Sequence, residues 1–566
     1  MSRSPHGVKF EAYRPVIMGR NGMVCSGHPL ASQAGIAMLQ KGGNAVDAAI
    51  ATAAALNVVE PLMSGIGGDG YLMIYSKAND VLSIVNATGA APLAATAEFY
   101  LPGGIPMKGI LSVSVPALLD GWLAAHEKYG SLSLAEVFAA AIDLAANGFP
   151  ISHVLAKAIA ADPLICQFPS SRAVFARDGH PLMAGEILYQ KDLARTLQAI
   201  VESGREVFYR GEIARALGKF SEELGGFLTE QDLARCSCRW EAPISTTYCG
   251  YSVYEAPPNS SGHVLLQELN LIEHFDLKAL GCNTAGSIHT MVEAKKLAFM
   301  DREAYLADPD FIDVPIEGLI SKEYAADRAK LIDPDRAATS GQPGDPWRYQ
   351  KRKAAARNRR SVSGGKQEDT TCFVVVDRWG NAVCQLQSLQ SSFGSSLIAG
   401  NTGILLNNRM TYWHLEPDHV DSLQPGKRVR HTMNPVMVFK EEPDGKRLIL
   451  VCGTPGADTQ VQTNLQVITH VLDFGMTVAE AVEAPRWRHT QNPTESAVPH
   501  SCKDELLLEG RFLEEIRSGL KRRGHEINVI GDWEAMGSEM MIQVDPESGA
   551  LFGAADPRRD GYAIGW

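Results

Sequence analysis

The sequence predicts a layered α+β protein in which β-sheets are covered by helices. Three observations lead to this prediction: a first part rich in helical patterns, a basic linker at about 336–369, and strand pairs that follow the linker. Helices that precede a run of hairpins favour layers of helix packed on sheet.

The first part alternates helical patterns with turns of small residues. Residues 45–59 are mostly Ala with a few branched residues, which is typical of a helix packed on several sides. Pro61 ends this helix, a flexible glycine-rich loop occupies 64–70, and 71–75 reads as a buried strand. Further helices are expected at 32–40, 117–128, 134–147, 191–202 and 285–306.

The sequence pattern changes from helical to strand-like after the linker. Residues 371–377 and 382–389 are rich in β-branched and aromatic side chains, and a turn at 378–381 joins them into a hairpin. Two further strands are expected at 435–440 and 447–452, and helices at 461–473 and 478–483. The linker carries seven Lys or Arg residues between 348 and 360, which is typical of a solvated segment and compatible with a segment that is cut during maturation.

Composition excludes several classes of function. The 566 residues carry a net charge of −12, which disfavours nucleic acid as a partner because no positive field collects phosphates. No run of 18 apolar residues indicates a membrane span, and the first 15 residues lack the apolar core of a secretory signal, so a cytoplasmic protein is expected. The ten cysteines are scattered and form no zinc-like set; neither a metal nor a cofactor is predicted.

Asp369-Thr370-Thr371 lies where the linker meets the first strand of the hairpin. A threonine hydroxyl is a weak nucleophile without a base beside it. A cut before Thr370 would free an α-amino group, with a pKa of about 8, to act as that base. Taken alone, a Thr-Thr pair at a strand edge is better explained by the preference of β-branched residues for strands than by catalysis.

Several segments, in order and at matching spacings, resemble the γ-glutamyltransferase family. They are GGNAVDAAIATAAALNVVEP, SGIGGDG, PPNSSGH at 257–263, EAKKLAFMDREAYLADP at 293–309, DTTCFVVVDRWGNAV from 369, SLQSSFGS, GILLNN, GTPGADTQVQTNLQVI at 453–468 and GAADPRRDG at 553–561. The resemblance runs from about residue 20 to the C-terminus.

The resemblance implies the four-layer αββα fold of N-terminal-nucleophile hydrolases. It also implies autocatalytic cleavage between Asp369 and Thr370, which makes a large subunit of residues 1–369 and a small subunit of residues 370–566. These would remain associated as a heterodimer, and whether heterodimers pair further stays open.

In the resemblance, Thr370 is both the agent of cleavage and the catalytic nucleophile. Ser388 matches a residue that forms a hydrogen bond near the nucleophile, and Gly456 and Ala457 match the pair whose backbone N–H groups form the oxyanion hole. Asn381 is either a catalytic residue or a former of the hairpin turn.

The positions that grip an amino-acid substrate differ from the family pattern. Thr88 stands where the family has the Arg that binds the substrate α-carboxylate, and Gln390 replaces a hairpin Asn. Arg409 and Tyr412 replace the Gln and Asp of the amine-binding stretch. His431 and Thr432 stand in place of the paired serines.

These changes predict a cationic pocket that suits a carboxylate without an adjacent amine. The expected reaction is acyl transfer from a small carboxylate-bearing amide to water, as in the branch of the family that includes oxamate amidohydrolases. The alternatives are an enzyme that still uses γ-glutamyl compounds such as glutathione, a cephalosporin-type acylase, and an unprocessed binding protein. A metal-dependent amidase is disfavoured because no H-x-H or H-E-x-x-H spacing occurs.

Three other motifs receive structural interpretations. The pairs 301–302 and 556–558 are expected to form ion pairs or helix caps. The glycine-rich loop at 64–70 lies between a helix and a strand, which is the wrong order for a dinucleotide cradle.

Overall fold

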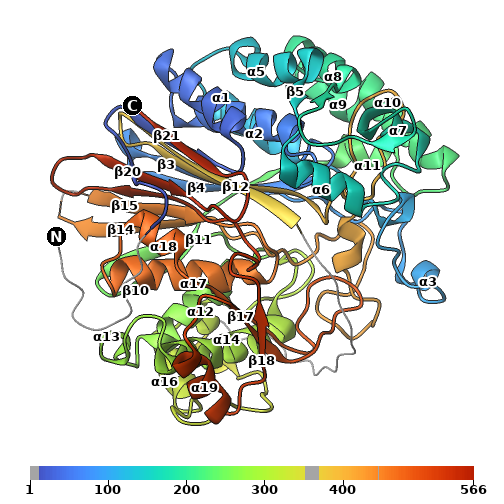
Figure 1. The fold of residues 1–566 in the computed structure, drawn as a ribbon. Coiled ribbons are helices and arrows are strands. Elements are labelled where there is room, and N and C mark those ends of the chain that lie inside the picture. The colour runs from blue at the N-terminus through green and yellow to red at the C-terminus, as the bar shows by residue number, and fades with distance from the viewer. Residues whose placement is uncertain (1–11, 351–368, 444) are drawn as a thin grey trace.

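The computed structural model describes residues 12–350, 369–443 and 445–566. Two seven-stranded sheets lie face to face, and helices cover the outer face of each sheet (Figure 1). All strand pairs within both sheets are antiparallel. The predicted α+β fold with four αββα layers is therefore confirmed.

One sheet, here called the β12 sheet, is built from both predicted subunits. Its strands in spatial order are β21 (Tyr562–Gly565), β2 (Gly22–Ser26), β12 (Asp369–Asp377), β13 (Ala382–Gln390), β3 (Asp69–Ser76), β4 (Val81–Ala87) and β9 (Arg239–Glu241). The central hairpin β12–β13 comes from the segment after the linker, and strands from the first 90 residues flank it on both sides.

The other sheet, here called the β14 sheet, mixes the two parts of the chain in the same way. Its strands in order are β1 (Ile17–Gly19), β20 (Leu551–Ala555), β19 (Met540–Val544), β15 (Gly445–Gly453), β14 (Val436–Glu442), β11 (Tyr251–Glu255) and β10 (Ile244–Tyr248). Three small sheets lie outside this pair. They are formed by β16 (Trp487–Thr490), β17 (Glu505–Glu509) and β18 (Ile527–Ile530); by β5 (Phe149–Pro150) and β8 (Ile187–Leu188); and by β6 (Ala176–Arg177) and β7 (His180–Pro181).

The outer face of the β12 sheet is covered by helices from the first half of the chain. They are α1 (Pro29–Gln40), α2 (Ala45–Val59), α4 (Leu118–Tyr129), α5 (Leu134–Asn147), α6 (His153–Ala161), α7 (Pro169–Phe175), α8 (Lys191–Ser203), α9 (Arg205–Tyr209), α10 (Glu212–Glu223) and α11 (Glu230–Arg235). Every residue of α2 is buried, which fits its Ala-rich sequence, and a capping box between Asn44 and Asp47 begins the helix.

A second helical layer covers the β14 sheet. It consists of α12 (Gly262–Ile272), α13 (Leu277–Leu280), α14 (Ala285–Tyr305), α16 (Lys322–Ala329), α17 (Thr459–Leu472), α18 (Val478–Glu483) and α19 (Glu514–Arg522). The short helices α3 (Ala97–Tyr100) and α15 (Ile316–Leu319), and the 3₁₀ turns η1 (Lys77–Asn79), η2 (Ile110–Ser112), η3 (Pro346–Tyr349) and η4 (Arg409–Tyr412), lie in the connections.

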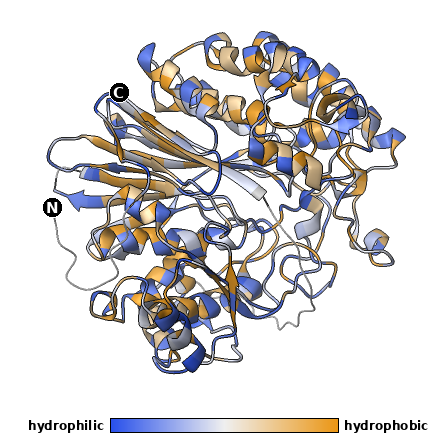
Figure 2. Cartoon of the chain, viewed as in Figure 1, coloured by the Kyte–Doolittle hydropathy of each residue, from blue (hydrophilic) through white to orange (hydrophobic). Residues whose placement is uncertain are grey.

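The core has an inner layer between the sheets and one layer under each helical cover. Along β12, Cys372 and Val374 point to the space between the sheets, whereas Phe373 and Val375 point to the helices. Figure 2 shows the same division, with hydrophobic residues along the central strands and hydrophilic residues frequent on the outermost helices. None of the helices in the described ranges is long and apolar enough to cross a membrane.

The helices and strands expected from periodicity all occur, with boundaries shifted by a few residues at most. The first part of the predicted linker, residues 336–350, is mostly exposed or half-exposed. Two contacts attach it to the rest of the fold: the hydroxyl of Tyr305 donates to the Gly344 carbonyl at 2.6 Å, and Pro346 lies beside Gly318. Most of the predicted basic run lies at 351–368, outside the described residues.

Candidate functional site

Thr370 is the second residue of β12 and is 4% exposed. The register with β13 shifts between Asp369 and Thr371, so the chain is irregular at this position. The Thr370 hydroxyl donates to Ser388 Oγ at 3.3 Å, and the same Ser388 oxygen accepts the backbone N–H of Gln390 at 2.7 Å. The structure therefore brings the predicted nucleophile and Ser388 together.

The predicted oxyanion loop begins where β15 ends. A Cβ added to Gly453 would lie 2.8 Å from the sulfur of Cys372, two residues along β12 from Thr370. Beyond it, Gly456 and Ala457 adopt φ angles of +117° and 49°. Their carbonyls accept hydrogen bonds from the first turn of α17, at 2.9 Å and 3.0 Å. Among the hydrogen bonds of the described residues, neither N–H of this pair has an acceptor.

Asp458 fixes the far end of this loop. Its carboxylate accepts the backbone N–H and the hydroxyl of Ser496, both at 2.7 Å, and pairs with the guanidinium of Arg302 from α14. Burial alone would raise the pKa of Asp458, but Arg302 and Ser496 outweigh it and lower the pKa. The expected structural role of Arg302 is confirmed, and its position ties it to the loop.

Asp69 is the central acid of the site, and the sequence analysis did not single it out. It begins β3 and lies opposite Ser388 in the sheet, so both side chains share the face that carries Thr370. Arg409 donates to both carboxylate oxygens of Asp69, from Nε and Nη2, each at 3.0 Å. The only signal in the sequence was an acidic residue in a glycine-rich loop next to a buried strand.

His431 completes this group, with its Nε2 3.1 Å from the Asp69 carboxylate. The backbone N–H of Met433 donates to Nδ1 at 3.4 Å, which assigns the proton of a neutral imidazole to Nε2. Burial, and then Arg409, lowers the pKa of His431. Burial opposes ionisation of Asp69, but the charges of Arg409 and His431 lower its pKa below the usual value.

The Arg409–Asp69 pair changes the expected charge of the pocket. Both side chains are at most 2% exposed, and the guanidinium lies 4.5 Å above the ring of Tyr412. Because Asp69 binds Arg409 through both carboxylate oxygens, the guanidinium is not a free positive charge in the pocket. The prediction of a cationic pocket is therefore corrected by an acid that the sequence analysis did not consider.

The other positions that differ from the family pattern bond to their neighbours. Thr88 donates to Asn86 Oδ1 at 2.6 Å and accepts from the side-chain amide of Asn259 at 3.3 Å. The hydroxyls of Tyr412 and Thr432 lie 3.3 Å apart. These replaced side chains are buried, and each bonds to a neighbouring protein group.

Gln390 and Asn381 behave differently from each other. Gln390 pairs with Asp369 across the hairpin, has a φ of 89°, and is 1% exposed. Neither atom of its side-chain amide has a partner among the described residues. Asn381 donates to the Asp377 carboxylate at 2.8 Å, and this favours the turn-forming interpretation of that residue.

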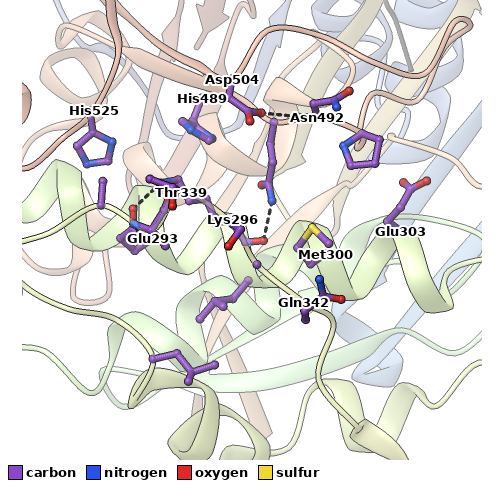
Figure 3. Close-up of a pocket in the computed structure, with 18 of the residues that line it drawn as sticks. Glu293, Lys296, Met300, Glu303, Thr339, Gln342, His489, Asn492, Asp504 and His525 are labelled. Carbon is purple, nitrogen blue, oxygen red and sulfur yellow. Dashed lines mark hydrogen bonds and ion pairs between the residues drawn. The ribbon is translucent and has the colours of Figure 1, made fainter. Parts of the chain in front are cut away.

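A sizeable cavity lies elsewhere in the molecule. It has a volume of about 740 Å³ and is bounded by α14, by residues 337–343 and by strands β16 and β17, and none of the predicted site residues lines it (Figure 3).

Comparison with known proteins adds the family context of this geometry. The family model described as gamma-glutamyltranspeptidase matches residues 31–566. A glutathione hydrolase-like proenzyme of Bacillus subtilis is 39% identical over 97% of this chain and 99% of its own length. An oxamate amidohydrolase proenzyme of Klebsiella pneumoniae is 33% identical over 96% of this chain and 98% of its own length. The crystal structure of a cephalosporin acylase from Bacillus halodurans matches with a TM-score of 0.87 and 35% identity, covering 100% of this chain and 99% of that structure.

Proposed function

Because the chain belongs to the γ-glutamyltranspeptidase family of hydrolases and acyltransferases, we propose that it matures by cleavage between Asp369 and Thr370. The cut makes a large subunit of residues 1–369 and a small subunit of residues 370–566. The observation that carries the proposal is Thr370 at the start of a rigid strand, bonded to Ser388 and next to the loop of Gly456 and Ala457. The proenzyme names of the relatives support the same order of events.

The mature site would act by nucleophilic catalysis. The freed α-amine of Thr370 takes the hydroxyl proton, the hydroxyl oxygen attacks the amide carbonyl, and a tetrahedral intermediate forms. The two N–H groups at Gly456 and Ala457 receive the oxyanion, since backbone donors held before reaction need no reorganisation. The amine of the substrate leaves with a proton, and water then hydrolyses the ester on Thr370.

We infer that the acyl group lacks the α-amino acid end of a γ-glutamyl group. The positions that would grip that end are occupied by Thr88, Tyr412 and Thr432, whose hydroxyls bond to neighbouring protein groups. A small carboxylate-bearing amide is the first candidate class. The candidate cation for its carboxylate is Arg409, which pairs with Asp69 opposite Ser388. The similarity to the oxamate amidohydrolase of Klebsiella pneumoniae supports this class.

The Arg409–Asp69 pair favours a second candidate, an amide with an uncharged acyl group. Arg409 already donates to both carboxylate oxygens of Asp69, so it would bind a substrate carboxylate more weakly than an unpaired guanidinium. The similarity to a cephalosporin acylase is consistent with this alternative. Glutathione and other γ-glutamyl compounds rank third, because Thr88, Tyr412 and Thr432 occupy the positions that would bind their α-amino acid end.

Two measurements test the proposal. Purified wild-type protein is expected to give two bands on a denaturing gel, and Thr370→Ala is expected to give one uncut band. The cut enzyme is then assayed on γ-glutamyl anilide, oxamate and uncharged acyl anilides. An uncut wild-type chain without activity on any amide contradicts the mechanism, whereas efficient γ-glutamyl turnover contradicts only the inferred acyl group.

A further inference from the structure

The cavity between α14 and the strands β16 and β17 has a polar end that the amide chemistry does not use. Figure 3 shows His525 and Glu293 near each other at this end of the cavity, with His489 also projecting from its wall. The side chains come from α14, from β16 and from the segment after α19. Three distant parts of the chain thus line this cavity, and α14 and the segment after α19 meet at its polar end.

Three potential metal ligands meet at that point. One ligand atom each from His289, Glu293 and His525 lies within 4.8 Å of the other two, and all three residues are buried. His289 and Glu293 are four residues apart on α14, which places them on the same helical face. Nδ1 of His289 is 2.8 Å from Nε2 of His525.

The hydrogen bonds of His289 leave the nitrogen that faces this point as a lone pair. Its Nε2 is 2.7 Å from the Asp333 carbonyl, and since a carbonyl only accepts, that nitrogen carries the proton of the neutral ring. Nδ1 is therefore unprotonated and accepts the N–H of His525 Nε2, so a bound cation would replace that proton between the two rings. A histidine that donates one N–H to a backbone carbonyl and turns its other nitrogen inward has the arrangement of a metal ligand oriented by its second contact.

Glu293 is held by groups that leave room for a further ligand interaction. One carboxylate oxygen accepts from Lys296 Nζ at 2.7 Å and the other accepts the backbone N–H of Ala338 at 3.0 Å. Each oxygen has two lone pairs, so coordination of an ion is compatible with both contacts. The Lys296 ammonium is the positive charge that a bound cation would have to oppose.

His489 provides a further observation on the wall of the same cavity. It is 6% exposed and lines the cavity, and its Nδ1 is buried with no hydrogen-bond partner among the described residues. A buried imidazole nitrogen without a partner costs free energy unless another group satisfies it. An ion with its hydration water, or a water alone, would satisfy it.

A second group of His and Glu residues provides a contrast. Glu303, His414 and His419 also lie within ligand distance of each other. There, however, Arg430 occupies the centre, because its Nη1 is 2.6 Å from the Glu303 carboxylate and its Nη2 is 3.3 Å from His414 Nε2. A fixed guanidinium already supplies the positive charge at that group, whereas no arginine of the described residues donates a hydrogen bond to His289, Glu293 or His525.

We propose that His289, Glu293 and His525 form a binding site for a divalent transition ion of the Zn²⁺ type, with one coordination position open to the cavity. Two imidazoles and one carboxylate are the donor set of many three-ligand zinc sites, and the fourth position of such a site takes water or a small ligand. The cavity supplies the entry path that a metal site requires. This inference is independent of the proposed amide hydrolysis.

The test is a titration of the metal-stripped full chain with Zn²⁺ by calorimetry and with Co²⁺ by visible absorption. One ion per chain is expected, with a Co²⁺ spectrum of nitrogen and oxygen ligands. Glu293→Gln and His525→Gln are each expected to weaken binding on the order of tenfold or more. Lys296→Met removes the competing charge and is expected to strengthen binding. This opposite sign is a result that general destabilisation would not produce.

His180→Gln is the matched control, because His180 is exposed and lies outside the cavity. Its affinity should equal that of the wild type, and thermal melting of each variant shows whether it is folded. Failure of the wild-type chain to bind either ion overturns the proposal. So does a Co²⁺ spectrum with thiolate charge-transfer bands that persists in His525→Gln, because it assigns the ion to the cysteines.

Discussion

Asp69 has the largest effect on the chemistry of the site at the level of single residues. It fixes Arg409 from both carboxylate oxygens and holds His431 in one tautomer, and all three groups are buried. A buried ion pair is weak evidence for stability, since desolvation offsets the attraction, but removing one partner leaves an uncompensated charge. The pair therefore sets the charge of the pocket more than the stability of the fold.

Asp69→Asn is expected to raise the preference for carboxylate-bearing amides over uncharged ones, because Arg409 loses its counter-charge. The free energy of unfolding should fall by about 3–5 kcal/mol, as for other broken buried pairs. The ratio of kcat/KM values for the two substrate classes is the readout, since that ratio is insensitive to the amount of folded enzyme. The double variant Asp69→Asn, Arg409→Met should recover part of the lost stability, and an unchanged substrate ratio in the single variant would contradict the assigned role.

A second residue-level feature is a stack of three imidazoles near the site. His414 lies between His419 and His500, with ring centroids 3.5 Å and 3.7 Å apart. Glu303 contacts His419 of this stack, and Arg430 contacts His414. Arg430 directly precedes His431 in the sequence. Burial, followed by the charge of Arg430, lowers the pKa of His500 to about 4.

This depressed pKa predicts an acid-sensitive fold. His500 is neutral when folded but gains a proton below about pH 6.5 when unfolded, so its contribution to stability is complete above that pH and is lost as the pH falls toward 4. At pH 5 the loss is about 2 kcal/mol. Glu303 has a lowered pKa, so its own contribution is lost only in a more acidic window.

Urea unfolding of the uncut Thr370→Ala chain at pH 7 and pH 5 measures this loss without subunit dissociation. His500→Gln should reduce the difference between the two pH values by about 2 kcal/mol, the contribution of that one group. His180→Gln, which changes an exposed ring, should retain the full difference. An equal pH dependence in all three chains would argue against the His500 assignment.

The loop between β15 and α17 is the element on which the proposed oxyanion hole depends. The first turn of α17 donates hydrogen bonds to the carbonyls of Gly456 and Ala457. Asp458, the next residue, is fixed by Arg302 and Ser496. Arg302 does not need to touch the substrate to affect the reaction. It positions the loop through Asp458.

Arg302→Met is therefore expected to lower kcat by about 100-fold with a small change in KM, because a displaced donor loses stabilisation of the transition state more than of the ground state. Arg328→Met is the matched control. Arg328, on α16, pairs with Asp301 of α14 at 3.4 Å. Its other hydrogen bonds within the described residues go to the carbonyls of Leu297 and Gln342 rather than to the loop. If both variants lose activity to the same extent, the effect is one of folding rather than of the loop.

Periodicity was sufficient to predict the elements themselves. The Ala-rich helix at 45–59 and the hairpin arms around residue 380 were readable because their patterns agree with their burial in the structure. The contacts of 336–350 with Tyr305 and Gly318 could not be predicted, because a Gly- and Pro-containing stretch shows no pattern that indicates its partners. Local pattern thus predicts an element's type and leaves its partners open.

The partners are a property of the whole molecule, and they account for what the sequence left unpredicted. Thr370, Ser388 and the Gly456 loop were found through motifs, but Asp69 meets Arg409 because the chain at Leu406 and Asn407 pairs with Gly67, just before β3. The cluster of His289, Glu293 and His525 likewise spans 236 residues and has no spacing motif. Contacts of this kind depend on topology, which residue spacing does not encode.

The same topology predicts the behaviour of the molecule after the proposed cut. In the β12 sheet, β12 pairs with β2 and β13 pairs with β3, so two strands of the small subunit are enclosed by strands of the large subunit. In the β14 sheet, β14 pairs with β11 and β20 pairs with β1 across the same boundary (Figure 1). Cutting one peptide bond leaves all four strand pairs and the core between the sheets intact.

The two fragments are therefore expected to elute as one species on size exclusion, at the volume of the uncut Thr370→Ala chain. They should separate only in denaturant, because separation would expose the strand edges and the inner apolar layer together. Light scattering on the eluted peak gives the number of heterodimers in that species. Fragments that separate in native buffer would show that the interlocked sheets do not hold the subunits, and would count against the proposed mature enzyme.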